Sequence, residues 1–133
     1  MSEKYLVDEN VIIDFLLGKT ELFNVFDNEE NIYISALSIG SLYEKAPKLI
    51  SVEDIVESCR DFCSQLNLIQ IDEKIAEKYS VLSNLASSLE INLTEKDLWF
   101  AACAVAYDLT AISQKNELKK ISELKMFYPN WLQ

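Results

Sequence analysis

The chain has 133 residues, of which 22 are acidic and 12 are basic, giving a formal net charge of −10. Half of the residues are hydrophobic and 26% are charged, a balance typical of one globular domain spanning residues 1–133 and not of a disordered chain. The absence of histidine excludes Ser-His-Asp and Cys-His catalysis and zinc sites that need imidazole, so any chemistry must use carboxylates, lysines, hydroxyls or thiols.

The predicted elements alternate between short strands and longer helices. Their limits follow from hydrophobic periodicity and from residues that begin or end helices. In chain order, the prediction gives strand 5–7, helix 10–17, an amphipathic segment at 22–26, strand 32–34, helix 36–45, helix 51–66, strand 68–71, helix 72–86, helix 94–107, strand 109–112, a short helix at 117–122 and an edge strand at 126–128.

Capping residues set several of these helix ends. Asn10 is expected to cap the first helix, and Asp72 the long helix 72–86. Pro47 is expected to end the preceding helix at about residue 45, because proline disfavours helical backbone at the residue before it. The patterns Ser51-x-x-Asp54 and Thr94-x-x-Asp97 both match a capping box.

Strands that are separated by helix-length connections cannot pair as hairpins. The fold class is therefore α/β, with a mainly parallel sheet of four to five strands and helices on both faces. Ligands of such sheets bind beyond the carboxyl ends of the strands. The polar residues that follow the strands are Asp8, Glu9, Asn10, Ser35, Ser38, Ser113, Gln114 and Lys115, and Asp97 in the first turn of a helix can join them.

A carboxylate cluster that holds Mg²⁺ or Mn²⁺ is one interpretation of these residues. Both ions prefer oxygen ligands and can activate water for attack on a phosphodiester. Asp8 fits this role because it directly follows a buried strand. It is equally explained as a turn residue whose carboxylate accepts a hydrogen bond from a backbone N–H. Asp97 is a candidate ligand too, although its spacing from Thr94 favours helix capping.

Charge and cysteine content restrict the partners and the location. An acidic surface favours basic peptides and metal ions over unassisted phosphate contacts. The i, i+4 pair Cys59 and Cys63 is more readily explained as small buried side chains than as metal ligands. The sequence shows no signal peptide, and its longest apolar run, 99–107, is too short for a bilayer. We therefore expect a cytoplasmic protein with no membrane contact.

Four segments together resemble PIN domains of the VapC type. They are YLVDENVIIDFLLG, IYISALSIGSLYEK, DLWFAACAVAYDLTAIS and KISELKMFYPNW, and they follow one another in the family's order over nearly the whole chain. The resemblance implies a three-layer α/β/α domain that is often a homodimer. It also implies Mg- or Mn-dependent cleavage of single-stranded RNA, by a toxin that is paired with an antitoxin.

The resemblance also implies which residues form the active site. The family's first acid maps to Asp8 and its third to Asp97, which makes both metal ligands and catalytic residues. The second acid maps to Ser41 and the fourth to Lys115, so two of the four acids are replaced. Asn10 and Ser113 would orient the water or the substrate.

Two nearby acids are possible substitutes for the missing ones. Glu44 lies one helical turn from Ser41, but a solvated surface acid is the favoured interpretation. Glu117 lies two residues beyond Lys115, and a catalytic role and a surface role are about equally supported. If Lys115 points inward, its ammonium group can take the electrostatic role of the metal; if it points outward, Asp8, Asp97 and Glu117 can still hold one ion.

Two functions follow from the sequence. The first is a ribonuclease with an altered site that uses Asp8, Asp97 and Glu117, which the intact first and third acids favour. The second is a non-catalytic module that binds a basic protein partner, which the net charge and the replacements at Ser41 and Lys115 favour. A nucleotide-binding domain is disfavoured because no glycine-rich loop follows the first strand.

Overall fold

The computed structural model describes residues 3–19 and 29–127. In these ranges the strands are β1 (Tyr5–Val7), β2 (Ile32–Ser35), β3 (Asn67–Ile69), β4 (Thr110–Ile112) and β5 (Met126–Phe127). The α-helices are α1 (Glu9–Leu16), α3 (Ala36–Leu49), α4 (Ile55–Cys63), α5 (Glu73–Ser88) and α6 (Glu95–Ala106). Two 3₁₀ segments, η2 (Glu29–Asn31) and η3 (Asn116–Lys120), precede β2 and β5.

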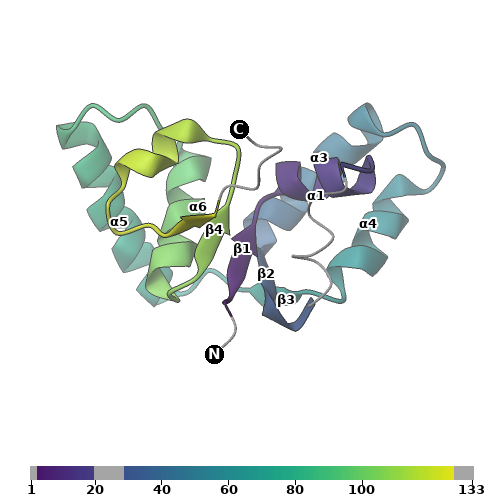
Figure 1. Cartoon of the computed structure of the whole chain (residues 1–133), viewed down its shortest axis with the longest axis horizontal. Helices are drawn as coiled ribbons and strands as arrows, with labels where there is room; N and C mark the ends of the chain where they lie inside the picture. Colours follow the sequence, from purple (N-terminus) through teal and green to yellow (C-terminus); the bar gives the residue numbers. More distant parts are fainter. Residues whose placement is uncertain (1–2, 20–28, 128–133) are drawn as a thin grey trace.

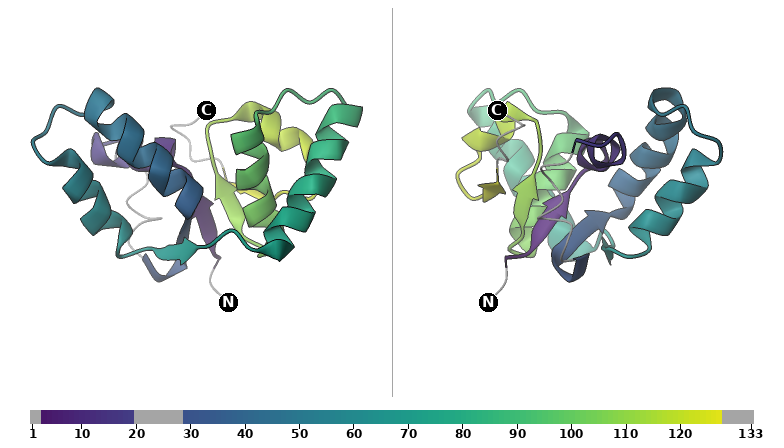
Figure 2. Two further views of the ribbon diagram at one scale, coloured as in Figure 1. Left: turned by 180° about the vertical axis from the view of Figure 1, so that it is seen from behind. Right: turned by 45° about the vertical axis from the view of Figure 1, so that its right-hand side comes forward.

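All pairs of neighbouring strands in the described sheet are parallel, and the strand order is β3-β2-β1-β4-β5. Helices α1, α3 and α4 cover one face of the sheet, and α5 and α6 cover the other (Figures 1 and 2). This arrangement confirms the predicted three-layer α/β/α fold with a parallel sheet. Helix-length connections between consecutive strands account for it, since they carry the chain back to the same end of the sheet.

Side-chain alternation along β1 divides the core between the two helical layers. The fully buried Leu6 packs in a cluster with residues of α5 and α6, whereas its neighbour Val7 packs with residues of α1, α3 and α4. The three cysteines are free thiols inside these two clusters, with Cys59 and Cys63 in one and Cys103 in the other. The prediction that they are buried packing residues is therefore confirmed.

The order of the strands reverses at β1. The chain proceeds from β1 to β2 and β3 on one side, and later adds β4 on the other side. Val7 is the register partner of Ile112, so the residues that follow β1 and β4 emerge next to each other at one edge of the sheet. A parallel α/β sheet forms its ligand crevice at such a reversal.

The cap of the first helix differs from the prediction. Asp8, and not Asn10, is the N-cap of α1, and its carboxylate accepts the backbone N–H of Val11 at 3.0 Å. The reason is that Asp8 keeps extended backbone angles directly after β1, which places its side chain over the first turn. Asn10 is already helical.

The predicted end of the next helix is also wrong. Helix α3 continues through Pro47 to Leu49 and does not stop before the proline. A proline in the last turn removes few intrahelical hydrogen bonds, and the buried Ala46 and Ile50 hold this turn against the core. The backbone N–H of Ile50 still donates to the carbonyl of Ala46 at 2.9 Å.

The capping box predicted at Ser51-x-x-Asp54 is not formed. Asp54 precedes α4 in the left-handed region, with φ of 57°, and its side chain makes no capping hydrogen bond. Helix α4 is also shorter than the predicted helix 51–66. Its buried side chains are Ile55, Cys59 and Cys63, and the helix ends at the last of them. The predicted caps of the two later helices are confirmed.

Two predictions fall outside the described residues. The amphipathic segment at 22–26 is one of them, and Tyr128 in the predicted edge strand is the other. Within the ranges that are described, no helix has the length and apolar character needed to cross a bilayer.

Candidate functional site

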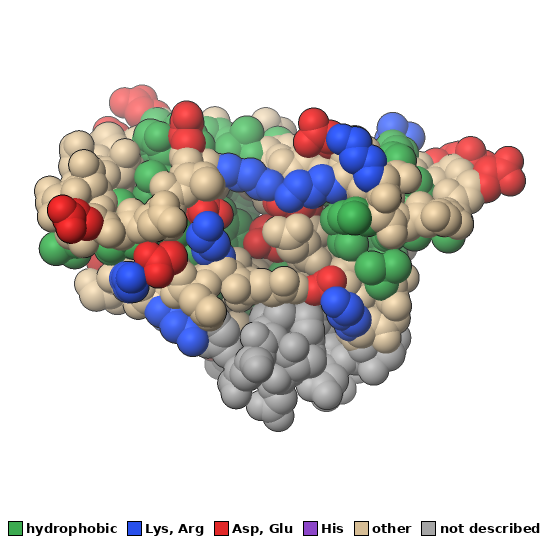
Figure 3. Space-filling model, turned by 90° about the horizontal axis from the view of Figure 1, so that it is seen from above, with side chains coloured by type: hydrophobic (Ala, Val, Ile, Leu, Met, Phe, Trp, Pro, Cys, Tyr) green, Lys and Arg blue, Asp and Glu red, His purple; other side chains and the backbone are tan. Residues whose placement is uncertain are grey.

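A small pocket opens where β1, β2 and β4 end and α1, α3 and α6 begin. Its volume of about 40 Å³ is enough for one or a few water-sized groups. The lining residues are Asp8, Glu9, Asn10, Ser35, Leu37, Ser38, Lys96, Asp97, Phe100 and Ser113. Figure 3 looks down on this end of the molecule and shows lysine side chains lying across acidic groups near its centre.

Asp8 has two roles in this geometry. One carboxylate oxygen caps α1, and the other accepts a hydrogen bond from the Ser113 hydroxyl at 3.3 Å. Burial raises the pKa of Asp8 from its ordinary value of 3.8 to about 6, and the neighbouring charge of Glu9 adds to this rise. The sequence left open whether Asp8 accepts a backbone hydrogen bond or belongs to the site, and the two roles are compatible because each uses a different carboxylate oxygen.

Ser113 and Asn10 lie on either side of Asp8. Ser113 is buried, and its hydroxyl oxygen also accepts the backbone N–H of Lys115 at 3.1 Å. Asn10 is exposed and lines the pocket from the first turn of α1. Both residues are thus placed where they can contact a group that enters the pocket.

Asp97 likewise combines a cap with a place in the pocket. It forms a capping box with Thr94, in which its carboxylate accepts the Thr94 backbone N–H at 3.0 Å. The same carboxylate oxygen lies 3.4 Å from the ammonium nitrogen of Lys115. Lys115 therefore contacts an acid of the pocket, although it does not line the pocket itself.

Glu9 was among the residues expected at this edge of the sheet, but the sequence analysis assigned it no catalytic or metal-binding role. Its side chain is only 1% exposed, and its Oε2 lies 2.5 Å from Lys96 Nζ and 3.7 Å from Lys45 Nζ. Its other oxygen, Oε1, is buried and has no hydrogen-bond partner within the described part of the chain. No local sequence pattern pointed to this role, because Lys45 and Lys96 are both far from Glu9 in the sequence.

The structure does not bring the two proposed substitute acids into the pocket. Glu44 is exposed on α3, where Ser41 is half-buried and also does not line the pocket. Glu117, on η3, accepts the backbone N–H of Asn92 at 3.2 Å and lies 2.9 Å from Lys120. The Lys120 hydrogen bond holds the pKa of Glu117 below its ordinary value.

The donor set does not fit a divalent metal ion in this arrangement. Within residues 3–19 and 29–127, no three acidic or thiol side chains converge closely enough to hold a metal. The pocket has three carboxylates, those of Asp8, Glu9 and Asp97. Their charge is offset by three ammonium groups: Lys45 and Lys96 contact Glu9, and Lys115 contacts Asp97. The pocket is therefore close to neutral and attracts a divalent ion weakly.

Comparison with known proteins agrees with this architecture. The sequence model of the PIN domain matches residues 5–124. VapBC from Salmonella typhimurium, in a DNA-bound crystal structure, superposes with a TM-score of 0.84 at 19% identity, over 95% of this chain and 98% of that one. VapBC2 from Rickettsia felis gives 0.78 at 22% identity, over 92% and 96% of the two chains.

A toxin–antitoxin complex from Klebsiella pneumoniae gives a TM-score of 0.75 at 23% identity, over 95% of this chain and 98% of that one. No curated protein sequence matches the chain significantly. The similar structures thus share the fold over nearly the full length of both chains.

Proposed function

Because this chain belongs to the PIN domain family, we propose that it is the toxin-type member of a pair with an antitoxin protein, and that its ribonuclease activity is weak or lost. Similarity to chains from VapBC and toxin–antitoxin complexes supports the pairing. The acidic surface, with a net charge of −10, suits a partner with a basic segment.

One observation carries the proposed loss of activity. Asp8 and Asp97 line the same pocket, yet the two other positions expected to carry acids hold Ser41 and Lys115, and Lys115 contacts Asp97. A pocket with this composition lacks the concentrated negative charge that recruits Mg²⁺ or Mn²⁺. Asn10 and Ser113 remain in place as groups that can orient single-stranded RNA or water.

The experiment is an RNA-cleavage assay with the unmodified protein and with the double variant S41E/K115D. A fluorescent single-stranded RNA is incubated with each protein in Mg²⁺, in Mn²⁺ or in EDTA. We expect background cleavage by the unmodified chain and metal-dependent cleavage by the double variant. Efficient cleavage by the unmodified chain would show that the altered pocket still works, and would contradict the proposed loss.

The second candidate function is a non-catalytic module that binds a basic protein. The ammonium contacts of Glu9 and Asp97 favour it, because they leave a pocket that is stable without a metal. The two candidates differ in the response of the double variant: only a toxin-type site with sound remaining parts regains cleavage. Co-purification with the product of a neighbouring reading frame tests the partner in both cases.

A further inference from the structure

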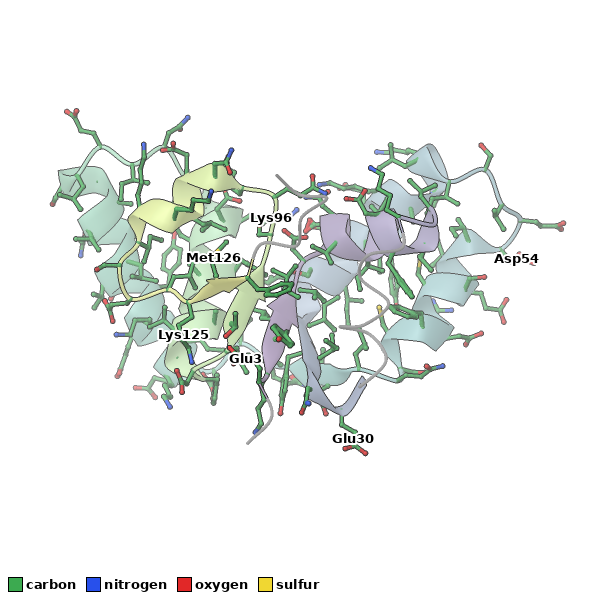
Figure 4. The ribbon with its side chains drawn as sticks, in the orientation of Figure 1. Glu3, Glu30, Asp54, Lys96, Lys125 and Met126 are labelled. Atoms are coloured by element: carbon green, nitrogen blue, oxygen red, sulfur yellow. The ribbon has the colours of Figure 1, made fainter. Side chains whose placement is uncertain are left out.

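Glu9 joins helices from both faces of the sheet through one carboxylate. It begins α1, which lies on the same face as α3, the helix that carries Lys45. Lys96 comes from α6 on the opposite face, and Figure 4 shows it at the upper end of the sheet, between α6 and α1. The contacts therefore lie at the carboxyl ends of the strands, where the pocket is.

The burial of Glu9 indicates that these contacts are required by the fold. A carboxylate that is removed from water is strongly destabilising unless a cation and hydrogen bonds compensate it. Glu9 is 1% exposed, while the side chains of Lys96 and Lys45 are 43% and 36% exposed and reach it from solvent. An ion pair between two exposed side chains would contribute little to stability, but here one partner, Glu9, has no access to water.

The position of Lys96 in its helix supports the same conclusion. Lys96 is the second residue of α6, and a cation in the first turn opposes the helix dipole. Local helix energetics therefore disfavour a lysine at this position. Its 2.5 Å contact with Glu9 supplies the compensating interaction.

One oxygen of Glu9 makes no hydrogen bond within the described residues. Oε1 is buried without a partner in the described residues, and Glu9 lines the pocket together with Asp8 and Asp97. Without Lys96, the buried Glu9 carboxylate would keep only the more distant Lys45, at 3.7 Å, in a pocket that already holds two other carboxylates. Such a pocket would have the charge, although not the original residues, of a divalent-cation site.

We propose that Lys96, anchored on Glu9 and assisted by Lys45, is the built-in cation of this pocket and takes the electrostatic role of a divalent metal ion. This inference rests on the proposed function, since it explains how the fold keeps Asp8 and Asp97 together while metal-dependent activity is weak or lost. Its consequence is specific: removal of the Lys96 charge should raise the affinity of the pocket for a divalent ion above that of the unmodified protein.

The test compares the thermal unfolding of K96Q with that of the unmodified chain, in EDTA and in millimolar Mn²⁺. In EDTA we expect the unfolding temperature of K96Q to fall by about 5–10 °C, because Glu9 loses its closest cation. Mn²⁺ should recover most of this loss, whereas it should leave the unmodified chain unchanged. Titration calorimetry should show Mn²⁺ binding to K96Q at least about tenfold tighter than to the unmodified chain.

The matched control is K74Q. Lys74 is also the second residue of its helix, α5, but its ammonium lies 4.8 Å from the ring centre of Tyr107 and not beside a carboxylate of the pocket. K74Q should therefore change the unfolding temperature little and should not respond to Mn²⁺. A similar Mn²⁺ response in K74Q and K96Q would assign the effect to nonspecific surface charge and overturn the proposal.

A second variant, E9Q/K96Q, keeps the proposal testable if K96Q does not fold in EDTA. Removing both charges should restore stability without metal and abolish the Mn²⁺ response. If E9Q/K96Q is as unstable as K96Q, Lys96 is needed for a reason other than the charge of Glu9, and the proposal is wrong.

Stabilisation of the unmodified chain by Mn²⁺ to the same extent as K96Q would overturn the proposal as well. This outcome is independent of the RNA-cleavage result, which tests the proposed function. Absence of cleavage by S41E/K115D together with a clear Mn²⁺ response of K96Q would contradict the proposed function and leave the role of Lys96 standing.

Discussion

The Ser113 hydroxyl donates a hydrogen bond to Asp8 at 3.3 Å and so connects the ends of β4 and β1, which are 105 residues apart in the sequence. The same Asp8 carboxylate caps α1 through the Val11 backbone N–H. One acid therefore ties together two strands and a helix at the reversal of the sheet. Changes at Asp8 should consequently be detectable in stability as well as in any activity.

The first prediction concerns the pH dependence of stability. The pKa of Asp8 is raised by burial to about 6, so the folded protein holds this proton over a range where the unfolded chain has lost it. Stability should therefore fall as the pH rises from about 4 to about 6. At pH 7 the Asp8 charge is disfavoured in the folded state, so we expect D8N to be more stable than the unmodified chain by about 1–3 kcal/mol.

Urea unfolding in EDTA between pH 4 and pH 7.5 measures this effect. Asparagine retains the helix cap, so the gain reflects the removed charge and should vanish near pH 4. D72N is the control with the opposite sign, because a hydrogen bond from Tyr107 lowers the pKa of Asp72, the N-cap of α5. D72N should be less stable than the unmodified chain at neutral pH, and a pH-independent gain in D8N would show that its charge is not responsible.

The second prediction concerns Lys115, which lies 3.4 Å from Asp97. K115D places two carboxylates where an ion pair stood, so it should lower stability in EDTA by about 1 kcal/mol. Mn²⁺ should recover this loss by binding to the folded state alone. Calorimetric titration of K115D and K119D with Mn²⁺ measures the effect, and tighter binding by K119D than by K115D would contradict a specific role of position 115.

The architecture followed from the sequence because it depends on patterns that local physics enforces. Strand-length apolar runs separated by helix-length segments required a parallel sheet. The polar residues expected after β1, β2 and β4 line one pocket, except Gln114 and Lys115. Errors occurred where the energy difference between alternatives is small. Whether Asp8 or Asn10 caps α1 depends only on whether the extended backbone ends two residues earlier or later. Pro47 is tolerated because it lies in the last turn of α3.

Long-range pairing is the part of the site that the sequence did not reveal. Glu9 looked like one more acid in a chain rich in them, and its partners Lys45 and Lys96 are distant in sequence. No periodicity connects residues 36 and 87 positions apart, so only the packing of α3 and α6 against the sheet brings them to one carboxylate. The hydrogen bond that Glu117 accepts from Asn92, 25 positions away, was not predictable for the same reason, whereas its ion pair with Lys120 is a local i, i+3 contact.

The third prediction concerns the capping box that holds Asp97. T94A removes the side-chain oxygen that accepts the Asp97 backbone N–H at 3.1 Å, and should lower the free energy of unfolding by about 1 kcal/mol. T94S keeps the hydroxyl and should stay within a few tenths of a kcal/mol of the unmodified chain. Urea unfolding compares the two, and equal losses in T94A and T94S would show that packing of the Thr94 methyl group, and not the cap, stabilises this turn.

The last prediction concerns self-association. The three cysteines are buried free thiols in the structure, so a homodimer should form through exposed apolar side chains and not through disulfides. Leu49 and Val52, at the junction of α3 and α4, are 57% and 56% exposed and lie close together in the sequence. We expect the unmodified chain to sediment as a dimer and the double variant L49S/V52S to sediment as a monomer at the same concentration. L89S, at the end of α5 on the opposite layer, removes a similarly exposed leucine and should leave the dimer intact. A dimer that dissociates only on addition of reductant would contradict the burial of the cysteines and, with it, this assignment of the interface.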